Sequence, residues 1–172
     1  PDKYKKWLEH MGKKDTELSK VRFTLSLVSW MGPKHIRGVP RLKWYLFIDD
    51  KKKGSVRTFR IDGSPLRSNV LGVIEEDRSN RKWMEYEGEI GPETRWIETK
   101  ELKGHMMILD KGTVDYNIEK KDNRELITLK FNGKKLTSKW EIYQDEPKTD
   151  YYTMKKVSSK LSKKFEFVYH RH

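Results

Sequence analysis

The chain has 172 residues, a length that suits one domain and can bury most of the surface that the unfolded chain would expose. Its 38 Lys and Arg residues against 26 Asp and Glu residues give a formal net charge of +12. Because the sequence has no cysteine, it excludes disulfides, zinc–thiolate sites, iron–sulfur clusters and thiol nucleophiles. No apolar run is long enough to cross a membrane and no signal peptide is visible, so we expect an intracellular protein of the cytoplasm, nucleoid or organelle matrix, without membrane contact.

The excess of positive charge indicates a polyanionic partner. Nucleic acid is the first expectation, and an anionic membrane surface is the second. The alternative is a lysine-rich proteome, in which the excess lysine is only a solvated surface. Since only 34% of the residues are hydrophobic, the core must depend on the aromatic residues, of which there are six Trp, eight Tyr and six Phe.

Residues 1–20 are predicted to form an N-terminal helical segment. Within Asp2–Gly12 the apolar side chains recur at helical spacing, with Gly12 as a plausible stop (Tyr4, Trp7, Leu8 and Met11). The alternation in Val21–Trp30 then predicts an amphipathic strand. A loop with two glycines and two prolines follows, and it carries Lys34, His35, Arg37 and Arg41.

Further strands are predicted along the chain, separated by turn signals: Leu42–Asp49, Ser55–Ile61, Val70–Glu76, Lys82–Glu89 and Tyr151–Val157. Between the last two, the stretch Ile108–Gln144 is predicted to hold three β-segments. Asp110-Lys111-Gly112-Thr113 is expected to break one strand and start the next. Asn132-Gly133 is expected to supply the positive φ of a tight hairpin turn between Leu126–Phe131 and Leu136–Tyr143.

The sequence therefore predicts a mainly β fold: a single-domain antiparallel β-barrel, or a sandwich, over residues 21–157. The short N-terminal helix precedes it, and residues 158–172 form a basic and aromatic C-terminal tail.

Chemical motifs are scarce. The sequence contains no phosphate-cradling glycine loop, zincin helix motif or nucleophile elbow. The acidic runs Asp49-Asp50 and Glu75-Glu76-Asp77 have the residue types that bind a hard cation, although in so charged a chain they are more often solvated turn residues. The candidates for binding an anion are the basic loop 34–41 and two basic turns, Lys51–Lys53 and Arg78–Lys82.

Three blocks give the chain a family resemblance: Met84–Glu93 (MEYEGEIGPE), Met106–Tyr116 (MMILDKGTVDY) and Leu129–Gln144 (LKFNGKKLTSKWEIYQ). In order and content they resemble the 3′-phosphoesterase domain of bacterial DNA ligase D and its stand-alone relatives, over about residues 21–156. The resemblance implies a small antiparallel β-barrel that trims 3′-terminal ribonucleotides and phosphates from DNA ends with manganese. In that family the metal is held by a His and by a His-Tyr-Asp run, with an Arg two residues further on.

Most of the family's metal set is absent from this sequence. His35 matches the first His, but the run aligns with Lys43-Trp44-Tyr45-Leu46-Phe47, so that Lys43, Tyr45 and Phe47 replace the second His, the Asp and the Arg. The family's phosphate-side His aligns near Arg78. One imidazole cannot hold a catalytic divalent cation against water, and Lys43 would repel the cation. Such a pocket could hold a phosphate without a metal, or the positions could have drifted to a structural core.

The sequence accordingly predicts a non-catalytic nucleic-acid-binding barrel of phosphoesterase-like ancestry, or a basic component of a larger protein–nucleic-acid assembly. It would contact DNA or RNA through phosphates and have no metal or cofactor. The predicted phosphate-binding residues are Lys34, His35, Arg37, Arg41, Lys43 and Arg78. One alternative is an active manganese-dependent end-processing enzyme of DNA repair that uses His35, the weak catalytic candidate, with Asp49 or Glu76. Another is a structural subunit that binds an acidic protein.

Overall fold

The computed structural model describes residues 17–31, 40–52, 54–97 and 103–157. Most of the predicted N-terminal helix and the whole tail 158–172 lie outside these ranges. The described elements are β1 (Glu17–Met31), β2 (Pro40–Asp49), β3 (Ser55–Ile61), β4 (Val70–Asn80), the 3-10 helix η1 (Arg81–Met84), β5 (Gly88–Ile90), β6 (Gly104–Lys121), β7 (Arg124–Asn132), β8 (Lys139–Gln144) and β9 (Tyr151–Val157). In this part of the chain no helix has the length and apolarity needed to cross a membrane.

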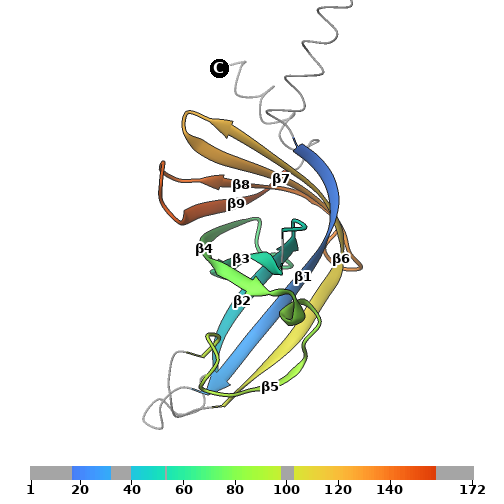
Figure 1. Cartoon of the computed structure of the whole chain (residues 1–172), viewed down its shortest axis with the longest axis vertical. Coiled ribbons are helices and arrows are strands. Elements are labelled where there is room, and N and C mark those ends of the chain that lie inside the picture. The colour runs from blue at the N-terminus through green and yellow to red at the C-terminus, as the bar shows by residue number, and fades with distance from the viewer. Residues whose placement is uncertain (1–16, 32–39, 53, 98–102, 158–172) are drawn as a thin grey trace, which may run out of the picture.

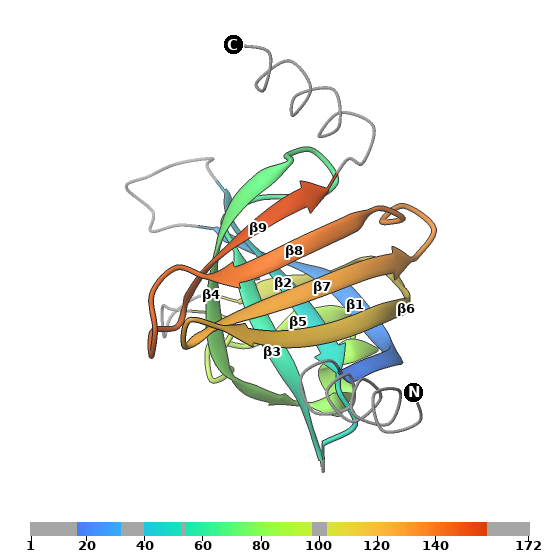
Figure 2. The ribbon, with the colours of Figure 1, turned by 90° about the horizontal axis from the view of Figure 1, so that it is seen from above.

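The strands form a closed antiparallel barrel, as the sequence predicts (Figures 1 and 2). Eight strands follow the order β1-β2-β3-β4-β9-β8-β7-β6, and β6 pairs with β1 from Gly104 to Ile118 to close the ring. β5 adds three residues to the other side of β6. β1 begins at Glu17, so residues 17–20 are strand and the predicted helical segment does not reach residue 20.

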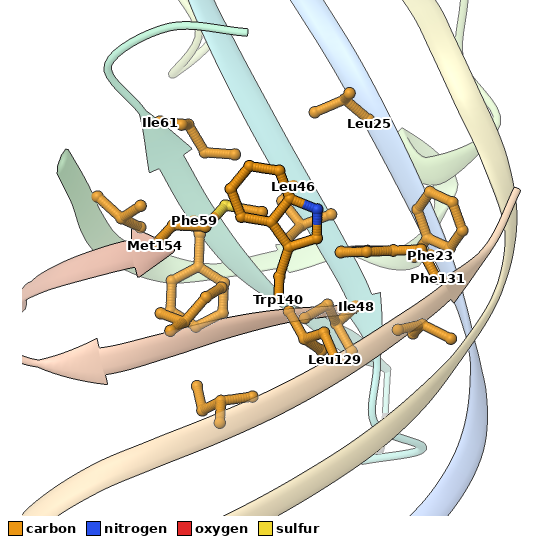
Figure 3. Close-up of a cluster of buried hydrophobic side chains, with 14 of the residues drawn as sticks. Phe23, Leu25, Leu46, Ile48, Phe59, Ile61, Leu129, Phe131, Trp140 and Met154 are labelled. Carbon is orange, nitrogen blue, oxygen red and sulfur yellow. The ribbon is translucent and has the colours of Figure 1, made fainter. Parts of the chain in front are cut away.

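Alternation along each strand fills the barrel with one hydrophobic cluster (Figure 3). Trp140 lies among residues from β2, β3 and β9, and it is 1% exposed. The rings of Phe23 and Phe131 meet edge to face at a centroid distance of 4.9 Å. On β7, Ile127, Leu129 and Phe131 point inward while Lys130 points to solvent, which is the alternation of a half-buried strand.

A second hydrophobic cluster covers the outer face of β1, β2 and β3. Residues 81–97 supply its outer layer, in a stretch where the sequence predicts a strand over Lys82–Glu89. That prediction is wrong: the Asn80 side chain accepts a hydrogen bond from the Lys82 backbone N–H at 3.0 Å and starts η1 instead. The segment then runs across the strands and buries Met84 and Trp96 against them. Ile97, next to Trp96, is buried in the same cluster.

β6 is continuous from Gly104 to Lys121, so the strand break predicted at Asp110–Thr113 is wrong. The register changes there instead: Leu25 lies opposite Asp110 and Ser26 opposite Ile108, which leaves Leu109 as a β-bulge. Gly112 lets another loop approach, because a Cβ at this position would lie only 3.1 Å from the Gly133 Cα.

The β7–β8 hairpin exists as predicted, but not with a tight Asn132-Gly133 turn. The φ angle of Gly133 is not positive, and residues 133–138 form a longer loop closed by a Gly133 N–H to Leu136 carbonyl hydrogen bond of 2.9 Å. β8 therefore begins at Lys139 rather than Leu136. The two-residue turn lies between β6 and β7, where Asp122 and Asn123 have φ angles of 56° and 61°, as a type I′ turn requires.

Candidate functional site

Three of the positions that the resemblance aligns with the family's metal site, Lys43, Tyr45 and Phe47, lie on the outer face of β2, in or beside the second hydrophobic cluster. Tyr45 and Phe47 are 1% and 0% exposed, and their rings pack edge to face on Trp96 at centroid distances of 4.8 and 5.6 Å. The Lys43 ammonium lies over the Trp30 ring, 5.3 Å from its centroid. These side chains are therefore part of an aromatic core, which leaves no water-accessible pocket at Tyr45 and Phe47.

The two carboxylates considered for a metal are held by arginines instead. Asp49 accepts hydrogen bonds from Arg22 at 3.2 Å and from Arg81 at 3.0 and 3.1 Å. Burial acts to raise the pKa of Asp49, but these arginine contacts and the Lys51 N–H outweigh it and lower that pKa. Glu76 likewise pairs with two arginines, Arg60 at 3.5 Å and Arg95 at 3.6 Å. Within the described ranges, no three His, Asp or Glu side chains are placed to hold a metal ion.

Of the predicted phosphate-binding residues, the three that the structure describes are not brought together. Lys34, His35 and Arg37 lie outside the described residues. Arg41 and Lys43 lie in the first half of β2, whereas Arg78 of β4 is level with Ile48 near the other end of β2, about 17–23 Å further along an extended strand. Arg78 there donates to the carboxylate of Asp50 at 3.0 Å and to the Ser55 hydroxyl at 2.8 Å, so its guanidinium already has an anionic partner.

A polar cavity of ≈ 500 Å³ opens at the Arg78 end of the barrel. Its floor is Arg57, a 7% exposed residue whose guanidinium binds Glu75 at 2.6 and 3.1 Å, the Tyr116 hydroxyl at 2.9 Å, and Glu125. The Tyr152 hydroxyl bridges the same two carboxylates at 3.3 and 3.2 Å. All five polar groups satisfy one another, which is the arrangement that a buried charge requires.

The pKa values of this network follow from its burial. Burial raises the pKa of Tyr116 to about 12, against the opposing charge of Arg57. Burial acts to lower the pKa of Arg57, but its hydrogen bond to Glu75 and the nearby negative charges outweigh this and raise that pKa. Since the guanidinium stays charged and its donors are occupied, the network stabilises the barrel end rather than offering a vacant anion site.

The outer face of β7, β8 and β9 has a different character, because no described segment covers it (Figure 2). We call this surface the open face, and it consists of the outward residues Leu126, Thr128, Lys130, Lys139, Glu141, Tyr143, Tyr151, Thr153 and Lys155. Lys130 of β7 lies directly opposite Lys139 of β8. Together with Asp115, Asn117 and Thr128, this lysine pair lines a shallow groove of ≈ 460 Å³.

The lysines of the open face are not ion-paired within the described residues. No ion pair joins Lys130, Lys139 or Lys155 to a carboxylate of the described residues, whereas the arginines at positions 22, 57, 60, 78, 81 and 95 are all ion-paired. Like charges directly opposite each other on a sheet repel and destabilise it. Asp115 of β6 lies opposite Lys130 on the other side of β7, so the two ammonium groups share the groove with one carboxylate that is ion-paired to neither of them.

Sequence reasoning missed the open face because it searched for loops in which basic residues are close in sequence. Lys130 and Lys139 are brought together only by the register of β7 and β8. The predicted two-residue turn at Asn132-Gly133 would instead have placed Lys130 opposite Lys135, so the sequence offered no signal for this pair; the longer loop 133–138 sets the register that brings Lys139 opposite Lys130.

Comparison of the sequence with protein-family models and with curated proteins found no match.

Proposed function

We propose that this protein binds nucleic acid through its phosphates, using the lysines of the open face. The observation that carries the proposal is the juxtaposition of Lys130 and Lys139 without a bonded carboxylate among the described residues. A phosphate placed between the two ammonium groups relieves their mutual repulsion. Neutralisation of that phosphate by the lysines also releases counterions that had been condensed on the nucleic acid. Because such interactions do not read base edges, binding is weakly sequence-specific and depends steeply on salt.

The proposal includes an ancestry. A barrel of 3′-phosphoesterase-like descent, in which Lys43, Tyr45 and Phe47 have replaced the second His, the Asp and the Arg, would keep the fold without the metal-dependent chemistry. The family's Asp-x-Gly and Gly-x-x-Leu blocks support this, since in this chain Asp110 and Gly112 contact the loop that carries Gly133 and Leu136. The nucleic-acid surface of such a barrel is then the open face, on the side away from residues 81–97.

The experiment is a fluorescence-anisotropy titration of a labelled duplex and a labelled single strand at rising salt concentration. Wild-type protein is expected to bind at low salt, with log affinity falling linearly against log salt concentration. Lys130→Glu with Lys139→Glu should weaken binding at least tenfold. The salt slope should also become shallower, by about 0.7–0.9 for each phosphate that the variant no longer neutralises.

The matched control is Lys51→Glu with Lys82→Glu. It changes the net charge by the same amount, but neither residue lies on the open face, and binding should change much less. Absence of binding to both probes at low salt would refute the proposed function. An equal loss in the control pair would show that net charge, and not this surface, determines binding.

A further inference from the structure

We infer that the preferred ligand of the open face is a single-stranded nucleic acid, with two bases stacked on Tyr143 and Tyr151. This inference rests on the proposed function and adds the class of nucleic acid and the residues that select it. Among the described residues, Tyr143 and Tyr151 are the two aromatic side chains that are more than a third exposed, at 38% and 60%. Both lie on the same face as the lysine pair.

The register places the two rings next to each other. Tyr143 of β8 lies opposite Thr153 of β9, and Tyr151 is two residues before Thr153 on the same face of β9. Such diagonal neighbours in an antiparallel pair are about 7–8 Å apart. Neither ring makes an aromatic contact or a hydrogen bond to another described residue, so the exposed part of each ring is open to a ligand.

The exposed rings and the lysines occupy opposite ends of one track. Lys139 and Tyr143 are four residues apart on β8 and point to the same side, which separates them by about 13 Å. Lys155 of β9 lies between these two ends, directly opposite Glu141. Glu141 is the one acidic residue among the outward residues of β8, and the positive charge of Lys155 offsets its negative charge. The track therefore offers phosphate-binding ammonium groups at Lys130 and Lys139 and aromatic rings at the other end.

This arrangement selects single strands over duplexes. A base inside a duplex is stacked on its neighbours and cannot lie on a protein ring, whereas an unpaired base can. The sheet is closed into a barrel, so an extended peptide finds no unpaired strand edge next to these tyrosines on β8 or β9. Charge complementarity and accessible ring faces together favour a single-stranded polyanion that carries bases.

The test is the affinity of a labelled 15-nucleotide oligo-dT strand and of a duplex of the same length, with Tyr143→Leu and Tyr151→Leu singly and together. Each leucine keeps an apolar side chain on the sheet surface but removes the stacking face. We expect each change to weaken oligo-dT binding about tenfold, within the range for base–aromatic stacking. Duplex affinity and the salt slope should stay unchanged, and Tyr143→Phe with Tyr151→Phe should bind as wild type does.

Two results would overturn the inference while leaving the proposed function in place. One is a double leucine variant, melting as the wild type does, that binds oligo-dT with unchanged affinity. The other is displacement of oligo-dT by polyglutamate as effectively as by unlabelled oligo-dT, which would show that charge alone holds the strand. By contrast, the proposed function itself fails if wild-type protein binds neither probe at low salt.

Discussion

The backbone N–H of Leu136 donates a hydrogen bond to the carboxylate of Asp110 at 2.7 Å, and both residues are buried. The same carboxylate accepts from the N–H groups of Lys134 and Lys135 at 3.1 and 3.0 Å. One side chain on β6 therefore orders the loop between β7 and β8, as a carboxylate can when several backbone donors converge on it. The segments 110–112 and 132–136 are thus structurally coupled in this chain.

Replacement of Asp110 should measurably destabilise the barrel. Asp110→Ala leaves three backbone donors without their acceptor, and we expect the free energy of unfolding in urea to fall by about 3 kcal/mol. Asp110→Asn keeps one acceptor oxygen and should lose less. Asp115→Ala is the control, because Asp115 lies on the same strand and its side chain is not hydrogen-bonded to another described residue. Equal losses at positions 110 and 115 would contradict the proposed role of Asp110.

Gly133 should not tolerate a methyl group. A Cβ there would overlap the Asp110 carboxylate and lie 2.9 Å from the Cζ atom of Phe23, so Gly133→Ala should cost about 1–3 kcal/mol of unfolding free energy. Gly72→Ala serves as the comparison, since its Cβ would meet only the exposed carboxylate of Asp62, which can move away. If thermal melts show the same shift for both variants, local crowding at Gly133 is not the cause.

Arg57→Met should be among the most destabilising single changes in the chain. It leaves Glu75 and Glu125 close together without their shared cation, a loss of about 3–5 kcal/mol for a broken buried ion pair. Adding Glu75→Gln and Glu125→Gln removes the stranded charges and should restore much of the stability. Urea unfolding of the single and triple variants checks this. A triple variant no more stable than Arg57→Met would argue that shape, not charge, governs this site.

The stability of the barrel should fall in alkali through Tyr116. Its folded-state pKa of about 12 exceeds the value of about 10 expected in the unfolded chain, so the neutral phenol favours the folded state. This contribution is complete below pH ~10 and is lost as pH rises towards ~12. The unfolding free energy, measured from pH 8 upward, should therefore decline between pH ~10 and ~12. The unfolding free energy of the Tyr116→Phe variant should decline less steeply over the same range.

The β6–β7 turn offers a stabilising change. Since Asn123 has a φ of 61°, Asn123→Gly relieves a left-handed conformation and should raise the unfolding free energy by about 0.5 kcal/mol. Asn132→Gly, at a position without positive φ, should instead lower it. A chemical-denaturation midpoint that moves the same way in both variants would exclude backbone conformation as the reason.

The regular parts of the fold could be predicted from the sequence because alternation reports burial directly. β3 over Ser55–Ile61 and β9 over Tyr151–Val157 have the predicted bounds. The failures are tertiary in origin. The pattern of Trp83, Met84 and Tyr86 in the sequence predicts a strand. These side chains instead pack on the outside of other strands, and no local sequence pattern shows which surface they cover.

The candidate site was harder to predict for the same reason. A loop rich in basic residues is visible in one stretch of sequence, while Lys130, Lys139, Tyr143 and Tyr151 become a surface only when three strands are in register. The sequence also cannot show that Arg78 would already be bound to Asp50, a residue 28 positions away.

The pairing of β1 with β6 has a consequence for how the chain reaches this structure. Glu17 lies opposite Ile118, and every residue of this seam joins parts of the chain that are far apart in sequence. Closing such a large loop costs entropy before the new interactions return any free energy, which places barrels of this kind among slowly folding proteins, in milliseconds to seconds. Until the seam forms, β1 and β6 each present an unpaired edge, so the interval before closure is when the chain is most exposed to self-association.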